Sequence, residues 1–208
     1  MTRPRPDRPP RRPVPALLAV GSWLLCLALP GIAAQPADLD ALMSLLGQVK
    51  RVEVSYQETV ESALIDTAIS TRGRLVYQAP DRIRRISDRQ EGFALDGDRM
   101  QLIADGRVIN ELVISGIAPL EAMVGALRAT FAGDLPALRA DYRLNYQPES
   151  AHWVLELAPR GRGLSNPFRG VEIVGDGASI TTIAMEEADG DQRTLRMRLL
   201  ARDPPGLD

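Results

Sequence analysis

Cysteine is almost missing from this 208-residue sequence, since Cys26 is the only one. Cys26 lies inside an apolar run near the N-terminus that is typical of a cleaved signal peptide. Leu25, which precedes it, is not the small residue of a lipoprotein signal. The mature chain would therefore carry no thiol. This excludes disulfides, thiolate catalysis and a cysteine metal site in an oxidising compartment.

Histidine is equally scarce, with His152 alone in the sequence. His152 alternates against Trp153 and Leu155, which places it on the solvent face at the start of a strand, and no second histidine offers a metal-binding spacing. Ser165 lacks the second glycine and the following helix of a nucleophile elbow. No nucleophile, base and orienting group can be assembled from these residues. The sequence therefore predicts a protein that is not an enzyme and has no cofactor and no metal.

Lysine is represented by Lys50 alone among 25 basic residues, so arginine supplies nearly all the positive charge. This bias lowers the functional weight of any single arginine. Residues 1–34 contain five basic residues and one acidic residue, which leaves 20 basic and 26 acidic residues in the mature chain, a formal charge of about −6. A net negative charge argues against nucleic acid as a partner.

The N-terminus has the three parts of a secretory signal peptide. Five arginines precede an apolar run over residues 14–29, and Pro30 and the small residues Gly31, Ala33 and Ala34 follow it. The run is shorter than the ~20 residues of a membrane-spanning helix, so an uncleaved anchor is the weaker alternative. Cleavage after Ala33 or Ala34 leaves residues 35–208 as one domain with room for a substantial core.

Alternation with a period of two dominates the rest of the chain. Val52, Val54 and Tyr56 point one way, while the polar residues between them point the other. Asp-Gly pairs at 96–97, 105–106, 176–177 and 189–190 supply the positive φ of tight hairpins and lack the later glutamate of a calcium loop. About eleven antiparallel strands are expected: 51–61, 67–78, 82–87, 92–95, 99–103, 108–114, 140–147, 153–158, 170–174, 179–186 and 192–200.

Two segments have the spacing of amphipathic helices, over residues 36–46 and 119–133, and a shorter turn is expected over 135–139. Residues 159–170 are rich in glycine, proline and arginine and are expected to form a long loop. The apolar stripes of the two helices consist of Leu39, Leu42, Met43 and Leu46, and of Leu120, Met123, Val124, Leu127 and Phe131.

An open sheet of eleven strands would leave long edges and an exposed apolar face. The expected fold is therefore mainly β, in the α+β class: an incomplete antiparallel barrel or curled sheet of about eleven strands, with amphipathic helices as a lid or plug over an apolar cavity. Five methionines occupy inward positions, where they suit either an adaptable pocket or an ordinary core. They are Met43, Met100, Met123, Met185 and Met197.

Three consecutive segments carry a resemblance to a known family: "VEVSYQETV", "STRGRLVYQAPDRIRRI" and "ALDGDRMQLI". Together with the signal peptide and the first helix they resemble the periplasmic outer-membrane lipoprotein carrier (LolA) family, with matching motifs between Tyr56 and Leu102. The resemblance implies an incomplete eleven-stranded barrel with a helical lid, whose apolar cavity shields acyl chains that cross the periplasm.

Three residues of the opening strands match the motifs of the LolA family, and a fourth occupies the position of a cavity residue. Gly73 and Leu75 match its Gly-x-Leu strand, Pro80 matches its corner proline, and Ile83 falls where the family has an aromatic cavity residue. The resemblance, together with the alternation, gives three groups of candidate residues. The cavity group is Val54, Tyr56, Leu75, Tyr77, Ile83, Met100, Leu102, Trp153, Leu155, Met185 and Met197; the lid group is Leu39, Met43, Leu120, Met123, Leu127 and Phe131; the corner group is Pro80 and Arg85.

Two positions depart from the family pattern. Ala79 stands where the carriers have a basic residue directly before the proline, and Arg85 stands where they have an aromatic residue. In the family, that basic residue is associated with lid closure and cargo transfer, so its absence favours a lipid or glycolipid cargo over a lipoprotein. Most arginines of the stretch 72–86 are expected to be solvated. Glu58 shares a face with Tyr56 and is interpreted as a sheet-end residue rather than as a polar group inside a cavity.

The sequence thus predicts a carrier or chaperone in the periplasm of a Gram-negative bacterium. It would shield acyl chains of a lipid, glycolipid or lipoprotein and deliver them toward the outer membrane. The resemblance implies an inner-membrane transporter and an outer-membrane receptor as partners of a monomer. The alternative is a periplasmic sensor that recognises mislocalised lipoproteins and regulates a membrane partner. An acyl-ester hydrolase that depends on His152 is the weakest hypothesis.

Overall fold

The structure is a computed structural model that describes residues 35–62, 67–160 and 168–207. Ala33–Asp208 forms one compact unit. The signal peptide expected over residues 1–34 lies outside the described residues. None of the helices in the described part of the chain is long and apolar enough to span a bilayer.

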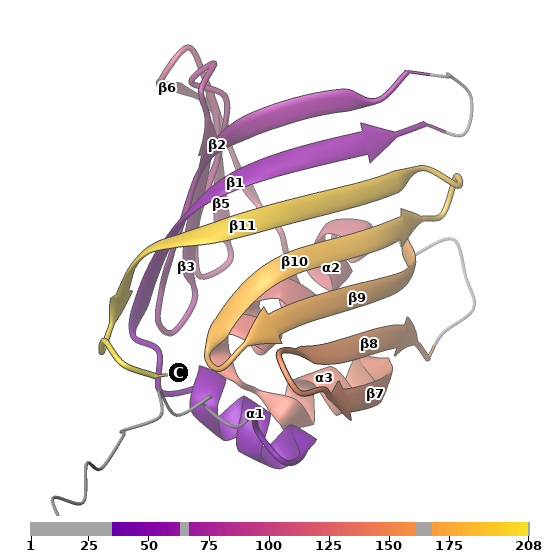
Figure 1. Ribbon diagram of the computed structural model, residues 1–208. Helices are drawn as coiled ribbons and strands as arrows, with labels where there is room; N and C mark the ends of the chain where they lie inside the picture. The colour runs from indigo at the N-terminus through magenta and orange to yellow at the C-terminus, as the bar shows by residue number, and fades with distance from the viewer. Residues whose placement is uncertain (1–34, 63–66, 161–167, 208) are drawn as a thin grey trace, which may run out of the picture. The chain divides into compact units, whose positions relative to one another are not determined.

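An antiparallel sheet forms most of this unit (Figure 1). Its strand order is β6-β5-β4-β3-β2-β1-β11-β10-β9-β8-β7, so every neighbour except the pair β1 and β11 is also consecutive in sequence. The sheet is curled but not closed, because β6 and β7 lie at its two edges. The strands are β1 Arg51–Glu61, β2 Ile69–Gln78, β3 Arg82–Ser87, β4 Gly92–Asp96, β5 Arg99–Ala104, β6 Arg107–Val113, β7 Tyr142–Pro148, β8 Trp153–Pro159, β9 Phe168–Asp176, β10 Ser179–Glu187 and β11 Gln192–Asp203.

The expected Asp-Gly hairpins are confirmed. Gly97, Gly106, Gly177 and Gly190 join consecutive strands with φ angles of 55°, 72°, 51° and 99°. These backbone conformations suit glycine, which has no Cβ to clash. The turns therefore explain why strands that follow one another in sequence pair with one another in the sheet.

Several expected strand boundaries differ from the observed ones by one to three residues. The strand expected from Ala140 begins at Tyr142, because Ala140 and Asp141 continue the preceding helix. The strand expected from Thr67 begins at Ile69, and the loop expected over 159–170 is shorter because β8 continues through Pro159 and β9 already begins at Phe168. Phe168 is buried against the core, so apolar packing extends β9 beyond what the glycine and arginine content of this segment predicted.

The three helices occupy the expected segments: α1 Leu39–Leu46, α2 Ala118–Ala132 and α3 Leu135–Asp141. Asp38 caps α1 by accepting a hydrogen bond from the Ala41 amide at 2.8 Å, and Asp134 caps α3 in the same way. Gly133 ends α2 with a φ of 66°, and a Cβ there would lie 2.0 Å from the Met43 carbonyl oxygen. The end of α2 is thus held tightly against α1.

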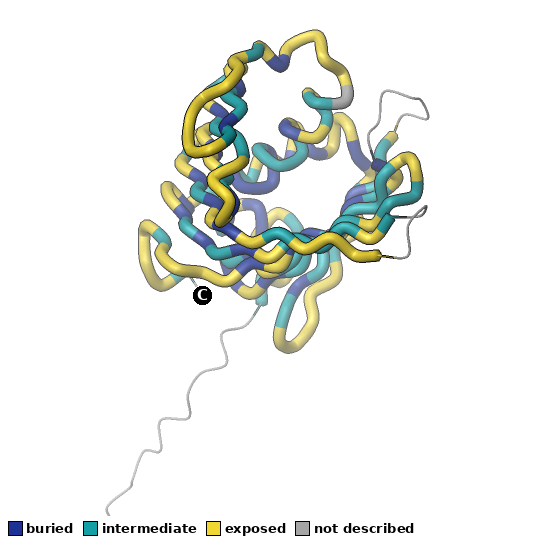
Figure 2. The backbone as a smooth tube through the Cα atoms, turned by 90° about the horizontal axis from the view of Figure 1, so that it is seen from above, coloured by how far each residue is buried: buried dark blue, intermediate teal, exposed yellow. Residues whose placement is uncertain are grey.

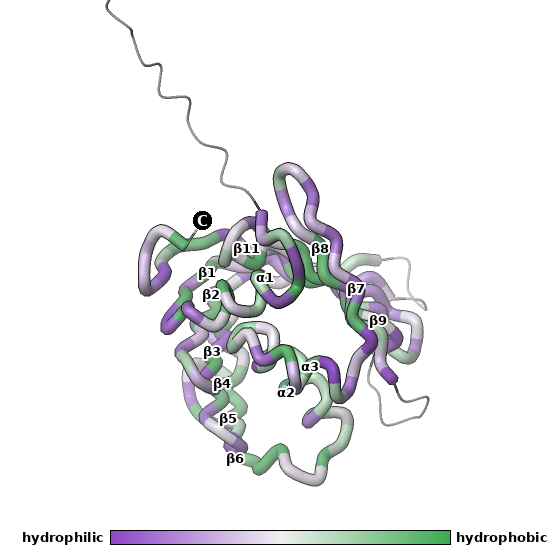
Figure 3. The backbone as a smooth tube through the Cα atoms, turned by 90° about the horizontal axis from the view of Figure 1, so that it is seen from below, coloured by the Kyte–Doolittle hydropathy of each residue, from purple (hydrophilic) through white to green (hydrophobic). Residues whose placement is uncertain are grey.

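The sheet curves around α2, and this arrangement positions the candidate site (Figure 1). Buried and exposed residues alternate along the strands, as Figure 2 shows, so one face of the sheet packs inward and the other meets solvent. The helices lie between the β3–β6 end and the β7–β9 end of the sheet (Figure 3). The inward face and α2 together enclose apolar space.

Candidate functional site

A cavity of about 360 Å³ lies between the inward face of the sheet and α2. This volume falls within the range of ~300–1,000 Å³ that small-molecule sites occupy. Eight strands and α2 contribute to its lining. The apolar lining consists of Leu75, Phe93, Leu95, Met123, Val124, Ala126, Leu127, Leu157, Phe168, Val171, Ile173, Ile180, Ile183, Met185 and Leu195, and the polar lining of Glu58, Arg85, Thr130, Glu187 and Arg193.

The strand register builds the wall of the cavity in rows across the sheet. Ile173 on β9 lies opposite Ile183 on β10, which lies opposite Leu195 on β11, which in turn lies opposite Glu58 on β1. Because directly opposed residues share one face of an antiparallel sheet, all four side chains belong to the inward face. This row therefore changes from apolar to charged as it reaches β1.

Helix α2 closes the opposite side of the cavity with Met123, Leu127 and their neighbours. The Thr130 hydroxyl donates to the Ala126 carbonyl oxygen at 2.8 Å, which satisfies this polar group within its own helix. Two side chains tie α2 to the rest of the fold: Tyr142 Oη donates to the Ala122 carbonyl oxygen at 3.2 Å, and Arg128 donates to the Gly97 carbonyl oxygen. These contacts anchor α2 over the apolar space.

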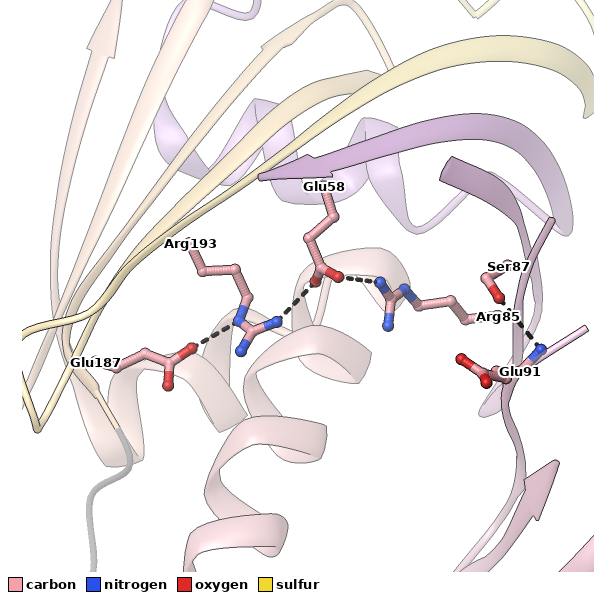
Figure 4. A network of polar contacts seen from close by, with 6 residues as sticks. All are labelled: Glu58, Arg85, Ser87, Glu91, Glu187 and Arg193. Atoms are coloured by element: carbon pink, nitrogen blue, oxygen red, sulfur yellow. Dashed lines mark hydrogen bonds and ion pairs between the residues drawn. The ribbon is translucent and has the colours of Figure 1, made fainter. Parts of the chain in front are cut away.

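Four charged side chains form a row along the lining of the cavity (Figure 4). Glu58 accepts hydrogen bonds from Arg85 at 2.5 Å and from Arg193 at 3.0 Å. Arg193 also donates from Nε to Glu187 at 2.6 Å. The row therefore alternates in sign from Glu187 through Arg193 and Glu58 to Arg85, and we call it the charged row.

The charged row is largely withdrawn from solvent, since the Glu58 side chain is 12% exposed and the Arg85 side chain 22%. Burial alone would lower the pKa of Arg193, but its hydrogen bonds to Glu187 and Glu58 outweigh burial and raise the pKa. Burial raises the pKa of Tyr56, and Arg85, whose guanidinium lies 4.6 Å from the centre of the Tyr56 ring, opposes part of that rise. Each member of the row thus lies against at least one group of opposite charge.

The interpretation of Glu58 as a sheet-end residue is wrong. Its side chain lies in the lining of the cavity and bridges two arginines. Alternation along β1 already placed Glu58 on the inward face with Tyr56. The sequence did not show that an arginine on β11 lies beside Glu58. Arg193 and Glu187 were not identified from the sequence, although Arg193 shares the inward parity of Leu195 and Met197.

The predicted cavity group divides into four sets. Leu75 and Met185 line the cavity, while Val54 and Met197 line a separate cavity of about 20 Å³ beside α1. Leu102 is half-buried against the core. The remaining six are buried in the core and do not line the cavity under α2: Tyr56, Tyr77, Ile83, Met100, Trp153 and Leu155. Alternation identified their inward face, but it could not show whether a neighbouring side chain fills the space before them.

The residues of the predicted lid group also lie in different parts of the fold. Met123 and Leu127 cover the cavity, whereas Phe131 stacks on Tyr77 with ring centres 5.1 Å apart and Met43 is buried in the core. Leu39 and Leu120 are half-buried at the margin of the core. The cover of the cavity is therefore α2, and α1 closes the end of the sheet.

The corner group and His152 take different places. The Pro80 carbonyl oxygen accepts a hydrogen bond from Tyr77 Oη at 3.2 Å, so the corner is tied to the core, while Arg85 points to the cavity. Arg82 and Arg84 on the same strand are exposed, which confirms that these two are solvated. The His152 side chain is 42% exposed and pairs with Glu149 at 3.2 Å, outside the lining of the cavity.

In the described ranges, no group of three or more His, Cys, Asp or Glu side chains is placed so that it could hold a metal ion. The site consists of an apolar volume, the anchored helix α2 that covers it, and the charged row. Such a site can bind an apolar molecule and orient a polar end of it.

Comparison with known proteins gives a family and a fold. Residues 32–204 match the family described as outer membrane lipoprotein carrier protein LolA-like. No curated protein matches the chain. A solved structure of a DUF1329 family protein from Desulfovibrio piger is 10% identical with a TM-score of 0.51, covering 83% of this chain and 95% of that one.

Two further solved structures match with lower scores. A LolA superfamily protein from Nitrosomonas europaea is 12% identical with a TM-score of 0.42, covering 80% of this chain and 94% of that one. A putative outer membrane lipoprotein-sorting protein domain from Vibrio parahaemolyticus is 11% identical with a TM-score of 0.37, covering 75% and 86%. At these identities the likeness of the first structure concerns the fold alone.

Proposed function

The chain belongs to the family of LolA-like outer membrane lipoprotein carrier proteins, and from that premise we propose that it carries a lipid through the periplasm with an acyl chain in the cavity under α2. The observation that carries this proposal is the cavity of about 360 Å³, whose lining is apolar apart from Thr130 and the charged row. An apolar volume of this kind, bounded by the sheet and α2, removes hydrocarbon from water without any covalent chemistry.

The energy available from burial is sufficient for this task. Each buried CH₂ contributes ~0.8 kcal/mol, so a chain of ~14 carbons would gain roughly 11 kcal/mol before the entropy of ordering the ligand is subtracted. Release requires that this term be reduced, which movement of α2 away from the sheet would achieve. Met123 and Leu127 are the residues of α2 that would then lose contact with the cargo.

The cargo we propose is a lipid or glycolipid rather than a lipoprotein. The cavity volume lies near the lower end of the range for ligand sites, which favours one acyl chain over several. Ala79 also replaces the basic residue that the LolA resemblance places before the corner proline. Export by the N-terminal signal, a donor in the inner membrane, an acceptor in the outer membrane and a monomeric state are parts of the same proposal.

The proposal is tested on protein exported to the periplasm by its own signal. Native mass spectrometry and lipid extraction should find a copurifying lipid, and delipidated protein should bind a fluorescent fatty acid. Binding should fall when Leu127→Asp places a carboxylate in the apolar lining, whereas Ala137→Asp on the exposed side of α3 should bind as the parent does. Protein that is free of lipid and also fails to bind the probe would rule the carrier out.

A further inference from the structure

The charged row is an unusual feature of a cavity built to exclude water. Desolvating ionised groups costs several kcal/mol each, and a buried ion pair is often no better for stability than apolar residues of the same size. The same strand shows the less costly arrangement, since Arg84, next to Arg85, is exposed on the outer face. Stability of the fold therefore gives no reason for placing two arginines and two glutamates on the lining.

Arg85 is the positive end of this row. Glu58 is the one carboxylate that it contacts among the described residues, and its guanidinium lies 4.6 Å from the centre of the Tyr56 ring. A guanidinium has five N–H donors in a planar fork. Arg85 therefore keeps donors for a second acceptor on the side of the cavity, to which its side chain is partly exposed.

Arg193 is already satisfied by two carboxylates, those of Glu58 and Glu187 at 3.0 and 2.6 Å. An incoming anion would meet Glu187 at that end of the row and would be repelled by it. At the other end it would meet Arg85, whose single carboxylate partner leaves the guanidinium open to a bidentate contact. The Arg85 end of the row can thus bind an anionic group, whereas the Glu187 end repels one.

We propose that the cargo is a single-chain amphiphile with an anionic head group, a carboxylate or a phosphate, and that Arg85 binds this head group while the chain lies under α2. This inference rests on the proposed function and adds the chemical class of the ligand. The apolar residues next to Arg85 in the register fit it, because Leu75 and Phe93 lie directly opposite on β2 and β4 and both line the cavity. The ligand would thus have its charge beside Arg85 and its first carbons against these side chains.

The test compares ligands of equal chain length at about pH 8, where carboxyl groups are ionised. Delipidated protein is titrated with palmitate, with hexadecanol, and with a lysophosphatidate of the same chain. The wild-type protein should bind an anionic ligand at least tenfold more tightly than the alcohol. The carboxylate and the phosphate arms show which head group Arg85 prefers, and a preference for either one supports the proposal.

Variants assign the preference to Arg85. Arg85→Gln should lower the ratio of anion to alcohol affinity to about one, while Arg84→Gln, one residue away on the outer face, should leave the ratio unchanged. Glu58→Gln should raise anion affinity, because it removes the carboxylate that competes for Arg85. Since this effect is opposite in sign, it keeps the test decisive if Arg85→Gln folds poorly.

The same titrations distinguish failure of the head-group site from failure of the proposed function. If palmitate, lysophosphatidate and hexadecanol bind equally well and Arg85→Gln changes nothing, the head-group site is refuted and the acyl-chain carrier remains. If none of the three ligands binds, the proposed function fails and the inference fails with it.

Discussion

Single residues fix how closely the strands around the site can approach, and Gly73 is the clearest case. A Cβ at Gly73 would lie 2.1 Å from the Ile86 carbonyl oxygen and 2.8 Å from Tyr56 Oη. The glycine of the Gly-x-Leu motif is therefore required by the close approach of β3 and of the Tyr56 ring. The sequence supplied the motif, but the atoms that leave no space come from two other strands.

Substitution of Gly73 by alanine should destabilise the fold. The added methyl group meets backbone, which cannot rotate away, so we expect a loss of about 1–3 kcal/mol in the free energy of unfolding. Gly170→Ala on β9 is the control, because a Cβ there lies 3.9 Å from the nearest atom, the Leu157 carbonyl oxygen, and should change stability by less than about 0.5 kcal/mol. Urea unfolding measures both. Equal stability of the two variants would contradict this account of the motif.

Elements of the fold were predicted well where short-range chemistry determines them. Asp-Gly turns and a period of two are local signals, and they gave the number of strands and the positions of the hairpins. The lining of the cavity was predicted less well. Leu75 and Trp153 have the same inward parity, yet Leu75 borders the cavity while Trp153 is packed in the core and donates to the Gly177 carbonyl oxygen. That difference depends on which side chains α2 and the neighbouring strands place in front of them.

The anchoring of α2 by Tyr142 should appear in the alkaline pH dependence of stability. Burial raises the pKa of Tyr142 to about 12, and Asp141 beside it adds to the rise. The unfolded chain loses this proton near pH ~10. The folded state holds the proton more tightly, so the contribution is fully present below about pH 10 and is lost as the pH rises toward about 12.

Tyr142→Phe isolates this effect from the other buried tyrosines. The variant loses the hydrogen bond to the Ala122 carbonyl oxygen, so it should be less stable at neutral pH. Between about pH 10 and 12 it should lose less stability than the wild-type protein, because one titrating group is gone. Thermal or urea unfolding at several pH values measures the two slopes. Identical slopes would show that Tyr142 ionises alike in both states.

At the scale of the whole molecule, the meeting of distant segments determines the site. Glu58 and Arg193 are 135 residues apart in sequence and touch because β1 and β11, from the two ends of the domain, are neighbours in the sheet. No local pattern reports that pairing, which is why the charged row could not be predicted from alternation alone. The expected number of strands and the family resemblance both predicted a curled sheet over an apolar cavity, and the structure adds where charged side chains enter the lining of that cavity.

The central claim is that the cavity under α2 holds the acyl chain, and filling the cavity tests it most directly. Ala126 lines the cavity from α2, and Ala137 lies exposed on α3. Titration of a fluorescent fatty acid should show that Ala126→Trp weakens binding at least tenfold, because the indole occupies the space of the chain, while its melting temperature stays close to that of the parent. Ala137→Trp should bind as the parent does. A folded Ala126→Trp protein that binds with undiminished affinity would place the acyl chain elsewhere and contradict the account.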